Sequence, residues 1–372
     1  MKYILFCFIA LNIAACTSQK ESYTQEQLYE KMSSGVVLVQ NIYNYEVSNE
    51  KYNSSYILTT RDRYTCHKYD YQTHDSIKKN YSNTIYGTGF FLNNKQTIVT
   101  NSHVINPKAD TIQLYNSIKA YLINEIEKHT KLLEANIELK SYCIEKLSNN
   151  ESLSNLEREF FNECDEYIKL QRDISEELLK ELQDKDFEEN YKIHIDAQIG
   201  VALNGSKISS NKDFGKVTVI KDVPNFDLGI IAPFKITSYA FGYSDENYND
   251  RYVFKLPNET DKGKNNEELK LYMIGFNRGP NLALTNEGIK AQITQGNISQ
   301  NTDSIKIMYS IPALQGSSGS PVVNQYGELV AVNFAGISTT QGFNYGIKAE
   351  RLKEILDDTS IQERINAVNR QE

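Results

Sequence analysis

The sequence predicts a mainly β protein whose strands form two barrels, with one long helical insertion and a helix near the carboxyl end. Short apolar or alternating runs, bounded by Gly, Asn and Pro, lie on both sides of an amphipathic stretch at residues 110–188. Outside that stretch strand follows strand, without the strand-helix alternation of a doubly wound sheet. These two observations predict a double β-barrel with an inserted helical segment.

Size and composition set the first limits. The chain has 372 residues, enough for one two-lobed unit or two domains. A formal net charge of -8 argues against a nucleic-acid binder, because binding the phosphate backbone needs a basic face. With 24% charged and 11% aromatic residues, the composition is that of a globular chain.

Residues 1–15 have the pattern of an export signal. Lys2 supplies the positive charge, a short apolar run follows, and Ala14 and Ala15 lead into Cys16. The run is too short to span a bilayer. The sequence Ile13-Ala-Ala-Cys16 resembles a bacterial lipobox. This resemblance implies cleavage before Cys16, lipidation of its thiol and anchoring in a membrane. The alternative is a plain secretory peptide with a cysteine near its end.

The anchored form has further consequences for the amino-terminal region. In lipoproteins, Thr17 rather than Asp after the cysteine favours the outer membrane. Residues 16–25 then serve as a polar tether. The resemblance therefore implies an exported bacterial lipoprotein on the periplasmic or surface face of the outer membrane.

The first barrel is expected from residues 26–109 and 189–235. A helix-prone run at 25–33 precedes a β-branched strand at 36–42, and a hairpin with an Asn-Asn turn covers 87–100. The polar residues 45–83 are typical of a long surface loop. Three potential metal ligands lie there but match no zinc spacing, so no metal or other cofactor is predicted: Cys66, His67 and His74.

The stretch at 110–188 has apolar residues at three- and four-residue steps among Lys and Glu. A polar break at 148–155 divides it into two long amphipathic helices, which a short connection folds into an antiparallel, coiled-coil-like hairpin. Folding about Ser152 brings Cys143 close to Cys164. Because an exported protein can form disulfides, we expect a bond between these two cysteines.

The remaining strands complete both barrels. Further strands of the first barrel are expected at apolar or alternating runs: 193–201, 216–221 and 228–231. A polar connector at 236–268 follows them. Residues 269–372 form the second barrel and a closing surface helix at 349–368. Its strands are expected at 271–276, 288–299, 304–311, 322–324, 329–334 and 342–347.

Three side chains stand at positions suited to nucleophilic catalysis. Ser318 lies between Gly316 and Gly319 in a tight turn that can expose a hydroxyl. His103 leaves a buried strand, and Asp227 begins an apolar one. Each has an ordinary alternative: a hairpin loop, a structural histidine or a turn-capping aspartate. Their order, His then Asp then Ser, is that of the chymotrypsin-like proteases.

The motifs around these residues resemble the trypsin-like serine proteases, and within them the bacterial HtrA/Deg and glutamyl-endopeptidase branch. They are Gly87-Thr-Gly-Phe-Phe, Ile98-Val-Thr-Asn-Ser-His103-Val, Phe226-Asp227-Leu-Gly-Ile-Ile and Gly316-Ser-Ser318-Gly-Ser-Pro. The resemblance implies two six-stranded antiparallel barrels of the chymotrypsin fold and an endopeptidase acting on proteins or peptides.

The same resemblance implies the roles of single residues. Ser318 is the nucleophile, His103 the general base and then acid, and Asp227 the group that orients the imidazole. The backbone N–H groups of Gly316 and Ser318 form the oxyanion hole. The substrate pocket is expected from residues near the nucleophile and on the strand after it: Pro312, Gln315, Asn333, Phe334 and Ala335.

The chain departs from its relatives in two places. Ser317 stands where trypsin has the Asp that pairs with a new amino terminus, so that mode of activation is not expected. A PDZ domain, present in HtrA/Deg enzymes, is not expected either, because only sixteen residues follow Leu356. The alternative function is a catalytically inactive protease fold that binds a protein partner through the helical hairpin; an esterase on the same triad is a third.

Overall fold

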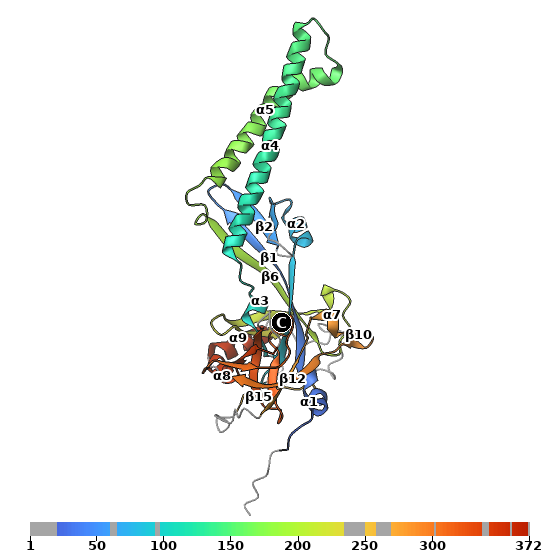
Figure 1. Ribbon diagram of the computed structural model, residues 1–372, viewed down its shortest axis with the longest axis vertical. Coiled ribbons are helices and arrows are strands. Elements are labelled where there is room, and N and C mark those ends of the chain that lie inside the picture. Colours follow the sequence, from blue (N-terminus) through green and yellow to red (C-terminus); the bar gives the residue numbers. More distant parts are fainter. Residues whose placement is uncertain are drawn as a thin grey trace, which may run out of the picture.

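The computed structural model describes residues 21–59, 65–93, 97–233, 250–257, 269–300, 303–336, 342–357 and 359–370. The predicted signal at 1–15, lipidation at Cys16 and most of the connector at 236–268 lie outside these residues. A body built from two barrels carries a long helical hairpin that projects from one end, while α1 (Gln25–Met32) lies at the opposite end (Figure 1).

The first barrel is a closed ring of six antiparallel strands in the order β1-β4-β5-β8-β7-β6, with β6 pairing back to β1. Its strands are β1 (Val36–Asn49), β4 (Asn83–Phe91), β5 (Ile98–Thr100), β6 (Tyr191–Leu203), β7 (Gly215–Val223) and β8 (Leu228–Pro233). The apolar residues of β1 and β8 are almost fully buried inside the body. Burial of these β-branched side chains is the main force that closes the barrel.

The outer halves of β1 and β6 leave the barrel and form a sheet of their own. β6 pairs with β1 as far as Asn49, whereas β4 pairs with β1 only as far as Tyr43. Beyond that point β2 (Ser54–Thr59) takes the place of β4, and β3 (Thr65–Lys68) pairs with β2. We call this outer sheet, β3-β2-β1-β6, the stalk sheet.

The stalk sheet corrects the prediction of a surface loop at 45–83. Besides β2 and β3, the region contains the end of β1 and α2 (His74–Asn80). Tyr45, Val47, Tyr56 and Leu58 alternate along the strands and are buried beneath the hairpin. The alternation is hard to recognise in the sequence because the region is rich in Tyr, Ser and Lys. Its buried positions are largely tyrosines, which here fill the place that aliphatic side chains take in other cores.

The predicted helical hairpin is confirmed. Its helices are α4 (Thr111–Ser148) and α5 (Asn155–Leu182). The side chain of Asp110 accepts a hydrogen bond from Gln113 N and caps α4, and Ser154 with Glu157 forms a capping box on α5. At 1.5 Å per residue α4 is about 57 Å long. Only the part of α4 up to Ile126 packs on the apolar cluster of the stalk sheet, so most of the hairpin stands clear of the body (Figure 1).

The predicted disulfide between Cys143 and Cys164 is absent, and the three described cysteines, including Cys66, are free. Cys143 Sγ lies 4.0 Å from Glu157 O, whereas Cys164 Sγ donates to Phe161 O at 3.2 Å within its own helix. The two thiols therefore belong to different levels of the hairpin. Each is buried and behaves as a small apolar side chain of the seam between the helices.

The second barrel closes in the order β12-β13-β16-β15-β14-β9, again with every pair antiparallel. The small sheet of β10 (Leu284–Thr285) and β11 (Gly288–Ile289) follows α7 (Pro280–Ala283). The barrel strands are β9 (Lys270–Gly275), β12 (Gln292–Gln300), β13 (Lys306–Tyr309), β14 (Pro321–Asn324), β15 (Leu329–Gly336) and β16 (Asn344–Lys348). Two six-stranded antiparallel barrels with a hairpin insertion confirm the predicted chymotrypsin fold.

The carboxyl end differs in detail from the predicted single helix. It forms α8 (Glu350–Leu356) and α9 (Thr359–Arg370). Ile361 and Ile365 of α9 are buried in the core shared by both barrels, so this helix covers the body instead of lying on its surface. Among the described helices none combines the length and the apolar character needed to cross a membrane.

Candidate active site

His103 is presented by α3 (Ser102–Ile105), a single turn that follows β5. The turn can pack against β8 because residue 229 is Gly: a Cβ there would lie 2.4 Å from Ile105 Cδ1. His103 itself stays at the surface of the turn, with its side chain 37% exposed. The strand end and the close packing of α3 on β8 together fix the position of the imidazole.

Asp227 holds His103 through two hydrogen bonds. Its Oδ2 lies 2.8 Å from His103 Nδ1, and its Oδ1 accepts from His103 N at 2.9 Å. The backbone of Asp227 has φ of +50°, uncommon for a non-glycine residue, and Asn101 Nδ2 donates to its carbonyl at 2.8 Å. The carboxylate therefore fixes the ring so that Nε2 is the nitrogen left for a reaction.

The serine turn at 315–320 comes from the second barrel. Gly316 has φ of +99°, and a Cβ there would lie 2.5 Å from Phe276 O, so only glycine fits. Ser317 N donates to Leu314 O at 2.9 Å and Ser320 N to Ser317 O at 3.0 Å. In the described part of the chain no acceptor bonds the N–H groups of Gly316 and Ser318, the pair expected to form the oxyanion hole.

Thr88 of β4 joins the serine turn to the first barrel. Its N–H donates to Ser318 O at 2.7 Å, its hydroxyl donates to Gly316 O at 2.9 Å, and the same hydroxyl accepts from Phe276 N at 2.9 Å. The side chain is fully buried. In the sequence this threonine appears only within a motif; the available signal was a single polar residue in the run Gly87–Leu92.

The same contacts bring the serine turn close to His103. Thr100 Oγ1 donates to Thr88 O at 2.8 Å, and His103 follows Thr100 by three residues. Ser318 is half-buried on the other side of Thr88. Over the described residues no hydrogen bond joins Ser318 Oγ to His103 Nε2. Catalytic hydrogen bonds of this kind often form only when substrate is bound.

Ser317 shapes the serine turn through its own hydrogen bonds. Its hydroxyl donates to Leu314 O at 2.7 Å and lies 3.1 Å from Asn333 Nδ2, which also donates to Ser317 O at 3.0 Å. Tyr309 Oη donates to Asn333 Oδ1 at 2.8 Å, and burial raises the pKa of this tyrosine well above its usual value. Both polar atoms of the Asn333 amide therefore have hydrogen-bond partners inside the body, and the residue is only 2% exposed.

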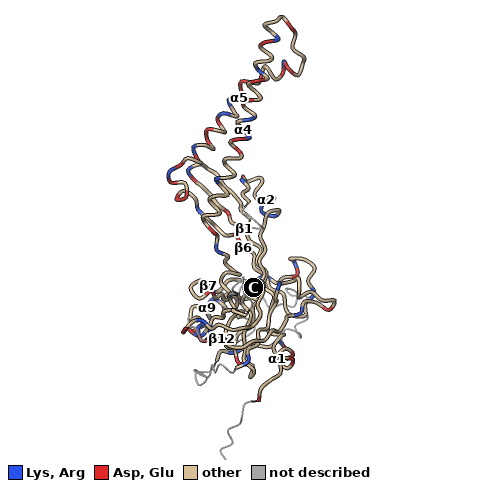
Figure 2. The backbone as a smooth tube through the Cα atoms, viewed as in Figure 1, with Lys and Arg blue, Asp and Glu red and all other residues tan. Residues whose placement is uncertain are grey.

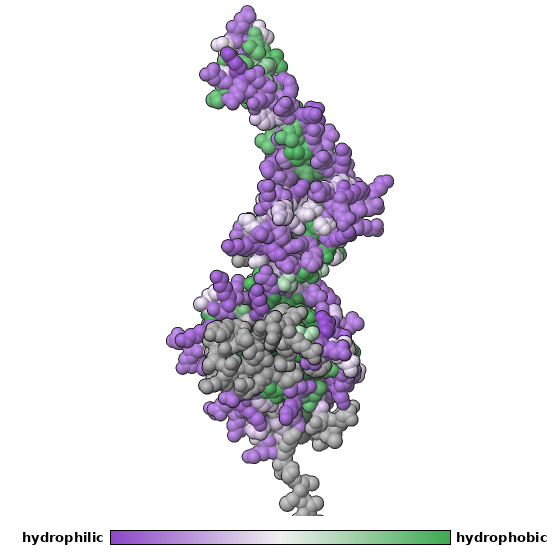
Figure 3. Space-filling view, turned by 180° about the vertical axis from the view of Figure 1, so that it is seen from behind, coloured by the Kyte–Doolittle hydropathy of each residue, from purple (hydrophilic) through white to green (hydrophobic). Residues whose placement is uncertain are grey.

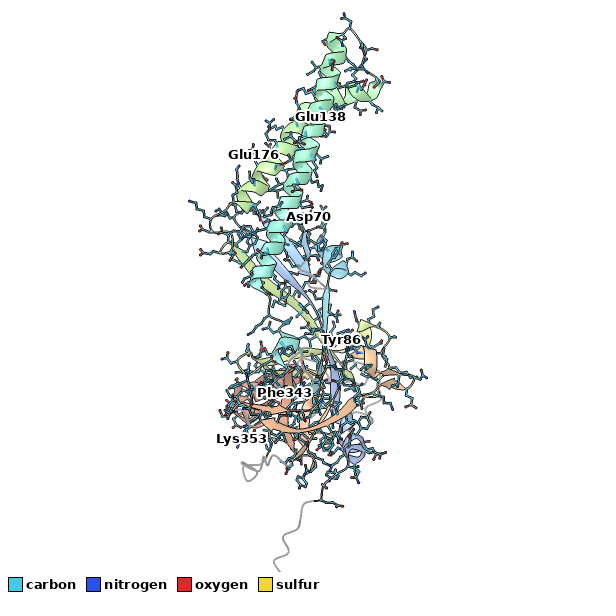
Figure 4. All side chains as sticks on the ribbon, viewed as in Figure 1. Asp70, Tyr86, Glu138, Glu176, Phe343 and Lys353 are labelled. Atoms are coloured by element: carbon cyan, nitrogen blue, oxygen red, sulfur yellow. The ribbon has the colours of Figure 1, made fainter. Side chains whose placement is uncertain are left out.

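The other residues predicted to form the substrate pocket differ in accessibility. Pro312 and Gln315 are exposed and Phe334 is half-buried, with Lys306 Nζ 5.3 Å from its ring centre. For Ala335 only the backbone is described. Phe343, just before β16, is 48% exposed and lies on the body (Figure 4). Asn333 therefore supports the serine turn from inside, whereas Pro312 and Gln315 are accessible beside and within it.

No group of three or more His, Cys, Asp or Glu suited to a metal ion occurs among the described residues. The three potential ligands at 66–74, one Cys and two His, are held apart by other contacts. His67 stacks on Tyr81 with ring centres 3.7 Å apart, and His74 Nε2 lies 3.2 Å from Glu46 Oε1. Burial raises the pKa of the Cys66 thiol, which keeps it protonated.

Two comparisons with known proteins found similarities to this chain. Residues 191–332 match the family model of the trypsin-like peptidase domain, a range that includes Asp227 and Ser318 and begins after His103 and the hairpin. A solved structure, the serine endoprotease from Yersinia pestis, is similar at 15% identity and a TM-score of 0.41, over 91% of this chain and 67% of that one. No curated protein matches. Residues 191–332 of this chain are therefore similar to a trypsin-like peptidase domain.

Proposed function

We propose that this protein is a serine endopeptidase that cleaves proteins or peptides through His103, Asp227 and Ser318. The observation that carries the proposal is the paired hydrogen bonding of Asp227 to the backbone and the ring of His103, at 2.9 and 2.8 Å. A turn-capping aspartate needs no such contact with an imidazole. The similarity to a trypsin-like peptidase domain gives the expected partner, a serine between two glycines.

In the proposed reaction Ser318 Oγ attacks the carbonyl carbon of the scissile peptide bond while His103 Nε2 takes the hydroxyl proton. The tetrahedral intermediate collapses, the C–N bond breaks, and His103 gives the proton to the leaving amine. Water then attacks the acyl-enzyme with His103 again as base, which releases the acid and restores Ser318. Asp227 keeps the correct ring nitrogen free and stabilises the imidazolium.

The oxyanion hole follows from the shape of the serine turn. The N–H groups of Gly316 and Ser318 have no acceptor among the described residues, so both are free to bind the developing negative charge. One such donor is worth about 3 to 4 kcal/mol of transition-state stabilisation. The positive φ of Gly316 and the hydrogen bond from Thr88 to its carbonyl set the direction of this part of the turn.

Labelling with a fluorophosphonate tests the proposal. We expect the purified chain to react at one serine and the Ser318→Ala variant not to react. Ser299→Ala, which changes an exposed serine at the end of β12, is the matched control and retains labelling. If the folded parent chain remains unlabelled, the alternative of an inactive protease fold that binds a partner through its hairpin replaces the enzyme.

We further propose that lipid on Cys16 anchors the exported protein in the outer membrane. The lipobox-like sequence before Cys16 supports this, and several acyl chains at about 0.8 kcal/mol per buried methylene give stable attachment. Membrane fractionation of cells that express Cys16→Ser tests the anchor. If that variant sediments with membranes as fully as the parent does, another feature attaches the protein.

A further inference from the structure

Each helix of the hairpin has an apolar stripe that faces the other helix and further apolar residues that do not. Between the helices His129 Nδ1 lies 2.6 Å from Gln171 Oε1. Cys143 and Cys164 are buried in this seam. The contact between α4 and α5 therefore uses one stripe of each helix and leaves the further apolar residues free for another surface.

At the base of the hairpin the face that carries these further residues packs on the stalk sheet. Tyr121 of α4 contacts Tyr56 of β2, with ring centres 5.6 Å apart, and Ile118 and Ile174 belong to the same apolar cluster. Leu178 of α5, which lies on the seam face fourteen residues after Cys164, is buried in the same cluster. The stalk sheet thus covers the first part of the face outside the seam.

Beyond the stalk sheet the same face continues without a cover. Seven residues are close to two helical turns, so side chains spaced by multiples of seven share a face. Leu132 and Leu139 follow Ile118 at such steps, Tyr142 follows Tyr121, and Tyr167 precedes Ile174. We call the exposed part of this face the outer stripe; its members are Leu132, Leu139, Tyr142, Leu156, Tyr167 and Leu170.

The outer stripe is exposed to an extent unusual for side chains of its kind. Its members are between 40% and 79% exposed, the highest value being that of Leu156. Of the described apolar side chains between residues 123 and 177, only those of Cys143, Leu153 and Cys164 are buried. Figure 3 shows apolar residues at the surface along the hairpin and near its tip. An exposed apolar stripe on an amphipathic helix marks an interaction surface.

The charge beside the outer stripe limits what can bind there. α5 carries nine acidic residues and four basic ones, a net charge of -5 (Figure 2). Glu163 accepts a hydrogen bond from Tyr167 Oη at 2.9 Å, and with Glu159 and Glu166 it raises the pKa of that hydroxyl. An acidic edge of this kind repels anionic lipid and the same edge of a second copy, and it attracts a cationic partner.

We propose that the outer stripe binds a basic amphipathic helix of a partner protein, which lies along the groove between α4 and α5 and completes a three-helix bundle. Apolar residues of the partner would pack against the stripe, and its Lys and Arg residues would pair with the glutamates of α5. From Leu156 to Leu170 the stripe is about 21 Å long, which matches about four turns of helix. This site is separate from the proposed catalytic residues.

A synthetic 21-residue peptide of Leu and Lys in heptad order is the probe, with a Leu and Glu peptide of the same pattern as its counterpart. Fluorescence anisotropy is measured with the full chain carrying Ser318→Ala, which excludes cleavage of the peptide. We expect the Lys peptide to bind and the Glu peptide to bind at least about tenfold more weakly. Leu139→Glu and Tyr167→Glu should each weaken binding of the Lys peptide about tenfold or more.

Ile137→Glu and Ile144→Glu are the matched controls. Both side chains are exposed, and Ile137 lies about 140° around α4 from Leu132, on the opposite flank of the helix. Binding should survive in both, with unchanged helix content by circular dichroism in all four variants. Absence of binding, equal binding of the two peptides, or equal losses in controls and stripe variants would overturn the proposal. Sedimentation showing a dimer that Tyr167→Glu dissociates would assign the stripe to a second copy.

Discussion

Replacing Thr88 by Val tests the link between the two barrels. Valine keeps the shape of the buried side chain but removes the hydroxyl that accepts from Phe276 N and donates to Gly316 O, both at 2.9 Å. Each buried group left without a partner costs about 1 to 3 kcal/mol. Two such groups together cost about 2 to 6 kcal/mol. We expect the free energy of unfolding to fall by about 3 kcal/mol, near the lower end of that range.

The same change should slow the proposed reaction. The carbonyl of Gly316 belongs to the peptide unit before Ser317, within the turn that carries both N–H groups of the oxyanion hole. Loosening it should lower kcat/KM by about 10- to 100-fold, less than the 10²- to 10³-fold lost with a whole donor. Because binding of substrate uses other contacts, most of the loss should appear in kcat.

Two measurements check this expectation. Urea unfolding is followed by far-UV circular dichroism, since the chain has no Trp, and activity by the rate of fluorophosphonate labelling. Thr88→Ser keeps the hydroxyl and serves as the control, with stability and labelling near those of the parent. If Thr88→Val and Thr88→Ser unfold at the same urea concentration and label at the same rate, the hydroxyl does not hold the turn.

Three further predictions concern the site and the hairpin base. Asp227→Asn should lower kcat by about 10⁴-fold, the loss known for this change in the triad, while the chain stays folded by circular dichroism. Glu181→Ala should lower the free energy of unfolding by roughly 3 kcal/mol in urea, because its buried carboxylate accepts from Ser54, Tyr56 and Tyr191 hydroxyls; an unchanged midpoint would contradict this. Hydrogen bonding to Lys51 lowers the pKa of Asp184 to about 2. The pair should therefore stabilise the hairpin base above about pH 4 and lose this effect as pH falls toward 2, and hydrogen exchange at low pH should show no such change in Asp184→Asn.

The candidate catalytic residues could be selected from the sequence because each depends on local chemistry. A serine between two glycines, a histidine after a buried strand and an aspartate before another are visible in order along the chain. Thr88, Asn101 and the supporting position of Asn333 were not visible in that way. Each donates a hydrogen bond to a residue far away in sequence: Asn333 to Ser317, Asn101 to Asp227 and Thr88 to Gly316.

The fold shows the same division. Periodicity in Lys- and Glu-rich segments predicted both long helices, because an amphipathic helix repeats its pattern over many turns. The stalk sheet was missed because its buried residues are largely tyrosines in a polar context, so alternation over four or five residues was not recognised. The disulfide was wrong because the alignment of the two helices depends on packing along the whole seam, which loop length fixes only to within about a turn.

By itself the sequence determined the order of the three candidate catalytic residues, the two barrels and the presence of a hairpin, because these follow from residue types and short-range periodicity. Only the tertiary structure decided that Thr88 joins the barrels, that Asn333 supports the serine turn, and that one face of the hairpin is covered at its base and exposed beyond it. The physical reason is that hydrogen-bond partners and burial are properties of chain segments that meet only in the folded molecule.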